Sequence, residues 1–186
     1  MKTRMTNLVH ELLAGHLRPK DKAIDATAGN GHDTLFLAKA VGGQGMVFAF
    51  DIQPEAIEQT RAKLTQEQIE NVRLILAGHE RMGELVSKEY LGQIAAITFN
   101  LGYRPGSDKS LVTQPETTLT AIECGLNYLK PNGLVTIVAY VGHPGGEEEA
   151  NAVRNWLEKL DKKLFDWKLY ESEAPQSPCT FVLRKL

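Results

Sequence analysis

The chain has 186 residues, with 21 Lys and Arg against 23 Asp and Glu, so its formal net charge is −2 with histidine neutral. This length is typical of one domain, and we expect a single domain over residues 1–186. Binding of nucleic acid through bulk electrostatics needs a marked excess of Lys and Arg, so the charge excludes that mode and leaves only a local basic patch. No stretch has the ~18 uninterrupted apolar residues of a membrane span, so we expect no membrane contact.

The cysteines and histidines narrow the expected compartment and chemistry. Cys124 and Cys179 form no CxxC pair, which together with the absence of a signal-peptide core predicts reduced thiols and a cytoplasmic location. His10, His16 and His32 have no metal-ligand spacing, so we predict no metal.

The first predicted element is a helix that follows Thr6, its predicted N-cap, and stops before Pro19. Its apolar residues recur at helical spacing, namely Leu8, Val9, Leu12, Leu13 and Leu17. Short apolar runs bounded by turn residues then predict strands at Ala23–Ala26, Met46–Phe50, Val72–Ala77, Ile94–Phe99, Leu134–Val141, Trp167–Tyr170 and Thr180–Leu183.

Two further helices are predicted from apolar stripes between these strands. The stripes are Leu119, Ile122, Leu126 and Leu129, and then Ala150, Val153, Leu157 and Leu160. Pro115 suits the first turn of one helix, and the acidic run Glu147–Glu149 suits the positive end of the other helix dipole.

The alternation of strands and helices predicts parallel pairing through right-handed crossovers. Only a short link around residues 174–178 joins the last two strands, which predicts an antiparallel hairpin. Five βα units closed by a hairpin is the layout of the Rossmann-like methyltransferases. The predicted fold is therefore α/β, a mostly parallel seven-stranded sheet with an antiparallel C-terminal hairpin.

The segment after the first predicted strand has the character of a nucleotide-binding turn. Gly29 and Gly31 remove side chains where a backbone must approach a ligand closely, and a helix is expected from about Asp33. The second strand leads to Asp51, at roughly the 20-residue offset at which a carboxylate accepts both hydroxyls of a ribose. Glycine turns also arise for steric reasons alone, which remains the alternative.

Charge around this turn discriminates between two nucleotides. Thr34 occupies the place of the third glycine of a dinucleotide fingerprint, and Asp25 and Asp33 would repel a pyrophosphate. The same carboxylates favour the ammonium and sulfonium of S-adenosylmethionine. We favour this methyl donor over NAD, and binding assays with each nucleotide decide between them.

Polar residues also follow the third, fourth and fifth strands. His79 is expected to frame an adenine or, alternatively, to face water at a helix start. Asn100 and Tyr103 keep the polar-x-x-aromatic spacing of amino methyltransferases, with Leu-Gly in place of Pro-Pro. The Asn100 amide oxygen would accept an amine N–H while Tyr103 packs on an attached ring; the alternative is a turn cap beside a half-buried aromatic. His143 would take a proton or simply face solvent.

Three motifs carry a resemblance to a known family over essentially the whole chain: DATAGNGHDT, FNLGYRPGSDKS and VAYVGHPGG. In this order and spacing they resemble the small bacterial family long labelled rRNA methylase, understood as the tRNA 5-aminomethyl-2-thiouridine methyltransferases of the YtqB/MnmM type. The resemblance implies a class I S-adenosylmethionine-dependent fold. It also implies methyl transfer to the aminomethyl nitrogen of the wobble uridine, with S-adenosylhomocysteine as product.

The resemblance also assigns residues to two sides of a site. On the donor side it implies Thr27, Gly29, Asn30, Gly31, Asp33, Asp51, Gln53 and His79, to which we add Asp25 and Asn100. On the acceptor side, expected to be catalytic, it implies Asn100, Tyr103, Tyr140 and His143. Arg104 and Ser107 depart from the family pattern, and the final turn at Gln176–Cys179 matches it loosely.

The expected macromolecular partner is a tRNA anticodon stem-loop, whose splayed bases enter a pocket without duplex melting. Arg104, Lys109, Lys2 and Arg4 are the predicted phosphate contacts, and a homodimer is a further expectation from so small a chain. The alternatives are methylation of rRNA or a small amine, or a non-catalytic module that binds the donor. A Cys179 thiolate attacking a pyrimidine ring is a less favoured chemistry.

Overall fold

The computed structural model describes residues 5–103, 106, 111–171 and 177–186. Within them, seven strands form one sheet in the order β3-β2-β1-β4-β5-β7-β6. The strands are β1 (Lys22–Asp25), β2 (Met46–Asp51), β3 (Val72–Leu76), β4 (Ile94–Leu101), β5 (Leu129–Ala139), β6 (Phe165–Tyr170) and β7 (Cys179–Lys185). Neighbours from β3 to β5 pair in parallel, whereas β7 runs antiparallel between β5 and β6, which confirms the predicted fold class.

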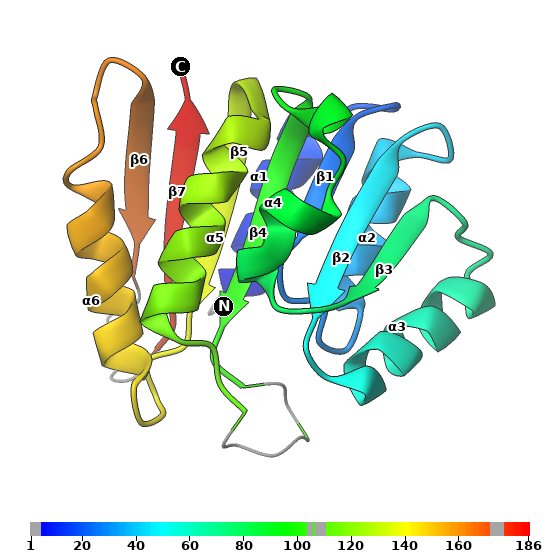
Figure 1. Cartoon of the computed structure of the whole chain (residues 1–186), viewed down its shortest axis with the longest axis horizontal. Coiled ribbons are helices and arrows are strands. Elements are labelled where there is room, and N and C mark those ends of the chain that lie inside the picture. The colour runs from blue at the N-terminus through cyan, green and yellow to red at the C-terminus, as the bar shows by residue number, and fades with distance from the viewer. Residues whose placement is uncertain (1–4, 104–105, 107–110, 172–176) are drawn as a thin grey trace.

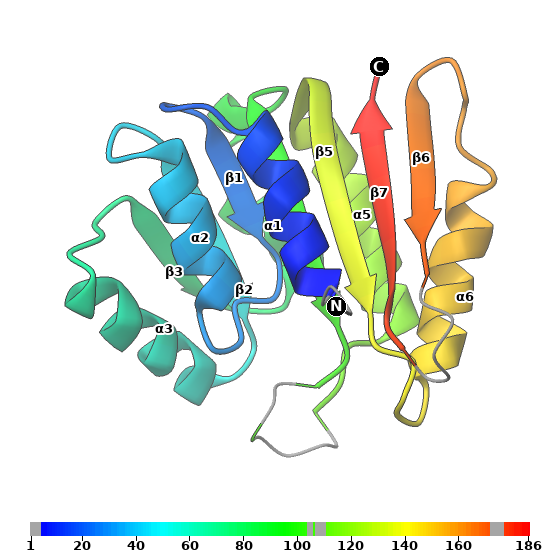
Figure 2. The same cartoon turned by 180° about the vertical axis from the view of Figure 1, so that it is seen from behind.

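Helices cover both faces of this sheet, so the domain has three layers (Figures 1 and 2). The α-helices are α1 (Met5–His16), α2 (His32–Val41), α3 (Pro54–Gln66), α4 (Met82–Leu85), α5 (Pro115–Tyr128) and α6 (Gly146–Leu157), and two short 3₁₀ helices are η1 (His79–Arg81) and η2 (Lys88–Tyr90). Figure 2 shows α1, α2 and α3 on the near face, while α4, α5 and α6 lie on the opposite face.

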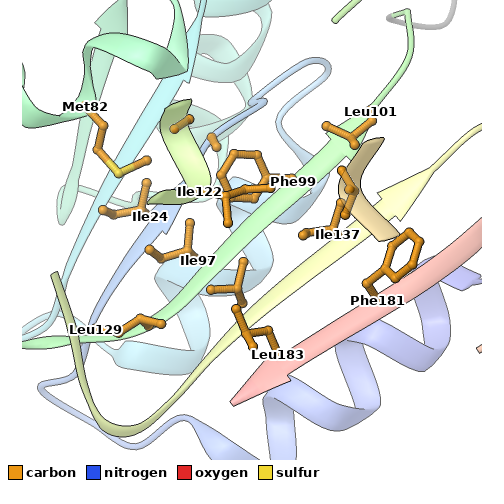
Figure 3. Packing of buried hydrophobic residues seen from close by; sticks show 14 of the residues in the cluster. Ile24, Met82, Ile97, Phe99, Leu101, Ile122, Leu129, Ile137, Phe181 and Leu183 are labelled. Carbon is orange, nitrogen blue, oxygen red and sulfur yellow. The ribbon is translucent and has the colours of Figure 1, made fainter. Parts of the chain in front are cut away.

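Apolar side chains fill both interfaces between helices and sheet. On the α5 side, Ile122 of α5 and Met82 of α4 pack against strand residues (Figure 3), and Val153 of α6 extends the same cluster. On the other side, Leu13 of α1 and Leu37 of α2 are fully buried against the sheet. The stripes predicted for α5 and α6 therefore mark the faces that the sheet buries.

Several predicted boundaries are wrong by a few residues. Thr6 lies inside the described part of α1, so it does not cap that helix. Leu129 begins β5 rather than ending the helical stripe, and Leu160 lies beyond α6. Tyr140 and Val141 follow β5 instead of extending it. Pro115 does stand in the first turn of α5, as predicted.

The candidate site lies at the carboxyl ends of β1, β2, β4 and β5. Because the strands are parallel, their carboxyl ends meet at one edge of the sheet, the lower edge in Figure 1.

Among the described residues, no helix has the length and apolar character needed to cross a bilayer.

Candidate active site

The turn between β1 and α2 requires glycine at Gly31 for two separate reasons. Gly29 and Gly31 have φ values of 52° and 76°, in the left-handed region that disfavours other residues. A Cβ added to Gly31 would lie 2.8 Å from Oγ1 of Thr60 on α3, closer than atoms pack. The turn is thus packed against α3 at Gly31.

Asp51 connects this turn to the next strand end. Its Oδ2 accepts the backbone N–H of Gly29 at 2.8 Å, and its Oδ1 accepts that of Gln53 at 2.9 Å. A carboxylate has about four acceptor positions, so two remain for the hydroxyls of a ribose. Gln53 is buried at the start of α3, and Asn30 is half-buried in the glycine turn.

Asp25 lies beneath the turn and is fully buried. Its Oδ2 accepts the hydroxyl of Thr34 at 2.6 Å and its Oδ1 accepts the N–H of Thr27 at 3.1 Å. Burial, with the nearby charge of Asp33, raises the pKa of Asp25 from 3.8 to about 7. Asp25 therefore supports the turn from below, and its predicted contact with the donor stays a prediction.

Asn100 is fixed at both its backbone and its side chain. Its N–H donates to Oγ1 of Thr27 at 2.7 Å, and its Nδ2 donates to Oδ2 of Asp33 at 2.6 Å. These contacts join the carboxyl end of β4 to the glycine turn and to the start of α2. The structure thus brings together one predicted acceptor residue and two predicted donor residues.

The ring of His79 is buried, so the alternative of a water-facing histidine is wrong. Its Nδ1 donates to the carbonyl oxygen of Ala26 at 3.2 Å, and its ring meets Phe99 edge-on at 5.7 Å. Burial lowers the pKa of His79, which keeps the ring neutral. Its buried Nε2 has no hydrogen-bond partner among the described residues.

Three predicted acceptor residues gather at the ends of β4 and β5. The rings of Tyr103 and His143 meet nearly perpendicularly, with centroids 5.7 Å apart. Tyr140 is 40% exposed, and its N–H donates to the carbonyl of Leu101 at 3.1 Å. His143 is half-buried and its Nδ1 donates to the carbonyl of Pro144 at 2.9 Å, so it does not simply face solvent.

A buried carboxylate that the sequence reasoning missed anchors this region. Glu149 of α6 accepts the hydroxyls of Thr113 at 2.6 Å and Thr118 at 2.7 Å. Thr113 in turn accepts the N–H of Gly102 at 2.8 Å, so a chain of hydrogen bonds ties α6 to the backbone after Asn100. Sequence position suggested only a dipole effect for Glu149, because a long-range hydroxyl partner leaves no local signal.

The surroundings of the β5–α6 loop are acidic. An open hollow of about 440 Å³ is lined by Val141–Gly145 together with Glu147 and Glu148. Across the described ranges, no group of three or more His, Cys, Asp or Glu side chains is arranged to hold a metal ion. Arg104, Ser107, Lys109, Lys2, Arg4 and Gln176 lie outside the described residues.

The order of the strands, the antiparallel β7 and the glycine turn beside Asp51 define a class I S-adenosylmethionine-dependent methyltransferase. A family model described as "Putative rRNA methylase" matches residues 47–184, and the chain belongs to this family. The model of protein-L-isoaspartate(D-aspartate) O-methyltransferases also matches residues 1–84, which include the glycine turn and Asp51.

Similar proteins cover the chain almost completely. A tRNA (mnm(5)s(2)U34)-methyltransferase of Arabidopsis thaliana, described as chloroplastic, is 40% identical over 97% of this chain and 68% of its own length. A protein described as a "putative rRNA-methylase", from Clostridium thermocellum, has a crystal structure that is similar to this chain, with 35% identity over 100% of both chains and a TM-score of 0.94. A "putative methyltransferase" from Streptococcus mutans, solved in complex with SAH, is 39% identical over 100% of both chains, with a TM-score of 0.88.

Proposed function

We propose that this protein transfers a methyl group from S-adenosylmethionine to the aminomethyl nitrogen of 5-aminomethyl-2-thiouridine at the tRNA wobble position. The observation that carries the proposal is the Asn100 amide at the end of β4, whose Nδ2 is held by Asp33 so that its oxygen is left for an amine N–H. The 40% identical relative, described as a tRNA (mnm(5)s(2)U34)-methyltransferase, supports the choice of this amine.

The donor fits the residues at the glycine turn. Asp51 has acceptor positions left for ribose hydroxyls, and the turn presents backbone without side chains at Gly29 and Gly31. Thr27, Asn30, Asp33, Gln53 and His79 complete the proposed donor side. When bound, S-adenosylmethionine supplies a methyl carbon on sulfur that an amine lone pair attacks, while the C–S bond breaks and its electron pair stays on sulfur.

On the acceptor side, the residues orient an amine rather than activate it covalently. An amine is nucleophilic only when neutral, and the Asn100 oxygen accepts one of its N–H groups so that its lone pair is aligned. The same oxygen stabilises positive charge as it develops on the nitrogen. Tyr103 and Tyr140 are the proposed packing surfaces for the uracil ring, and His143 is the proposed acceptor of the proton that the product releases.

Covalent attack by a thiolate is not favoured by the geometry. Cys179 is buried on β7, where burial and the charge of Glu171 raise its thiol pKa. A raised pKa reduces the thiolate fraction, so this cysteine is a poor nucleophile. Replacing Cys179 with alanine is therefore expected to leave turnover in place.

For the tRNA backbone we propose the basic side chains of Arg104 and Lys109, with Lys2 and Arg4. Glu147 and Glu148 make the β5–α6 loop unsuited to phosphate, so the backbone must approach from elsewhere. Reversing the charges of Arg104 and Lys109 is expected to raise KM for tRNA, and an unchanged KM contradicts the proposal. A cytoplasmic location is part of the proposal, and the free thiols of Cys124 and Cys179 support it. A homodimer is also proposed, and light scattering tests it.

Nucleoside mass spectrometry of tRNA tests the proposed reaction. A strain that lacks the gene for this chain is expected to accumulate 5-aminomethyl-2-thiouridine, and the wild-type gene is expected to restore the methylated nucleoside. Normal tRNA nucleosides together with a missing methyl group in rRNA contradict the proposal and favour an rRNA substrate. Intact modification of both tRNA and rRNA in the deletion strain contradicts the proposal and favours a module that only binds the donor.

A further inference from the structure

His10 on α1 reaches the site although no motif includes it. Its Nε2 lies 2.5 Å from Oδ1 of Asp33, so this nitrogen carries the proton of the hydrogen bond. Its ring stacks on Phe36 of α2, with centroids 4.0 Å apart and planes inclined by 3°. The imidazole is therefore held by a flat apolar contact and aimed at one carboxylate oxygen.

Asp33 uses its two oxygens for different partners. Oδ1 accepts from His10, whereas Oδ2 accepts from Nδ2 of Asn100 at 2.6 Å. Burial raises the pKa of Asp33, but the hydrogen bonds from His10 and Asn100 outweigh it and hold that pKa below its ordinary value. Asp33 is thus an anionic acceptor at neutral pH, and both of its oxygens are engaged.

The orientation of the Asn100 amide decides what the acceptor meets. Rotating the amide by half a turn would exchange its oxygen for its NH₂ group, and a donor would then face the N–H groups of an amine. Asp33 prevents this exchange because it accepts only from the NH₂ side. Its negative charge also polarises the amide, which makes the opposite oxygen a stronger acceptor.

We propose that His10 is a positioning residue for methyl transfer, acting through Asp33 to fix the amide of Asn100 with its oxygen toward the acceptor nitrogen. The inference rests on the proposed function and deepens it. His10 touches neither substrate, and no proton leaves it during the reaction. Its contribution lies in orienting a carboxylate that would otherwise rotate toward solvent.

Three variants separate the hydrogen bond from the packing of His10. His10→Phe keeps the stack on Phe36 and removes the donor, whereas His10→Gln offers an amide N–H in place of Nε2. His10→Met keeps an apolar contact with Phe36 and also lacks the hydrogen-bond donor. It replaces His10→Phe in the measurements if the phenylalanine variant does not fold. Glu11→Gln, on the same helix at an exposed position, is the matched control.

Steady-state kinetics with aminomethyl-containing tRNA test the inference. His10→Phe is expected to lower kcat by roughly ten-fold while KM for tRNA and Kd for S-adenosylhomocysteine change by less than about two-fold. His10→Gln is expected to keep most of the wild-type kcat, and Glu11→Gln all of it. An unchanged kcat in His10→Phe overturns the inference, as does a loss confined to donor affinity or a loss that His10→Gln does not recover.

A second measurement does not depend on the substrate. The side-chain ¹⁵N–¹H₂ resonances of Asn100 are expected at the same shifts in wild type and His10→Gln, and displaced in His10→Phe. Equal shifts in all three proteins overturn the inference even where the tRNA reaction stands. Absence of methyl transfer by the wild-type protein contradicts the proposed function alone, and the amide resonances still test the role of His10.

Discussion

Three aspartates at one sheet edge have the same side chain and different properties. Asp25 is fully buried and its pKa is raised to about 7, Asp33 is held anionic by two hydrogen-bond donors, and Asp51 accepts two backbone N–H groups. Environment therefore separates a carboxyl that shapes the turn, one that orients an amide and one with acceptor positions left for a ligand.

The raised pKa of Asp25 predicts a pH dependence of stability. Because the folded protein holds this proton more tightly than the unfolded chain, wild type loses stability as pH rises from about 4 to about 7. Each pH unit in that window costs up to about 1.4 kcal/mol. In urea unfolding, the unfolding free energy of wild type should fall relative to that of Asp25→Asn as pH rises across this window, because only wild type carries the titrating carboxyl. A constant difference contradicts the assignment.

Asn100 is expected to act on the rate rather than on donor binding. Asn100→Ala should leave Kd for S-adenosylmethionine nearly unchanged and slow methylation by roughly ten-fold or more, because it removes alignment of the amine. Calorimetry and single-turnover kinetics measure the two quantities. Asn127→Ala, at an exposed position on α5, is the control, and a loss of donor affinity equal to the loss of rate contradicts the proposed role.

At the scale of elements, the proposed site is formed mainly by the connections that follow the strands. The turn from β1 to α2 is held by Thr60 of α3 and by Asp51 at the end of β2. The segment after β4 is held by Thr113 and Glu149. Each connection is thus fixed by an element distant in sequence. Rigid support of this kind is what a site needs in order to hold two reactants in line.

Gly31 and Gly42, at the two ends of α2, allow backbone strain to be distinguished from steric fit. Gly31 and Gly42 both have positive φ, at 76° and 67°, but only Gly31 has a neighbour within 4 Å of an added Cβ. Gly42→Ala should therefore lose roughly 1–2 kcal/mol of stability and bind the donor normally, whereas Gly31→Ala should also raise Kd by roughly ten-fold or more. Equal donor affinity in the two variants would count against a ligand-facing turn.

At the scale of the whole molecule, one continuous sheet joins the two halves of the proposed site. The donor side lies at β1 and β2, while the two tryptophans, Trp156 and Trp167, lie on α6 and β6 in the other half. Apolar clusters run along both faces of the sheet, so we predict that the halves unfold together.

Thermal unfolding followed by tryptophan fluorescence and by far-UV circular dichroism tests this cooperativity. Both signals should give one coincident transition, and S-adenosylhomocysteine should shift both to higher temperature although the tryptophans lie far along the sheet. Two transitions, of which the ligand shifts only one, contradict the prediction of a single domain.

The order of strands and helices follows from local sequence, because the period of apolar residues is set by the geometry of each element. The same holds for the glycine turn, Asp51 and the polar-x-x-aromatic spacing from Asn100 to Tyr103. Element ends were less predictable: β5 begins at Leu129 rather than Leu134, since tertiary pairing with β4 extends it beyond its apolar run.

Residue chemistry at the site was decided by the tertiary structure. His10 and Asp33 are 23 positions apart and Asp33 and Asn100 are 67 apart, so no local pattern joins them. Burial raised the pKa of Asp25 and turned His79 away from water. Sequence alone therefore determined which segments form the sheet and which residues follow its strands. Only the folded chain decided ionisation and hydrogen-bond partners, because these depend on distance and solvent exclusion between segments far apart in the chain.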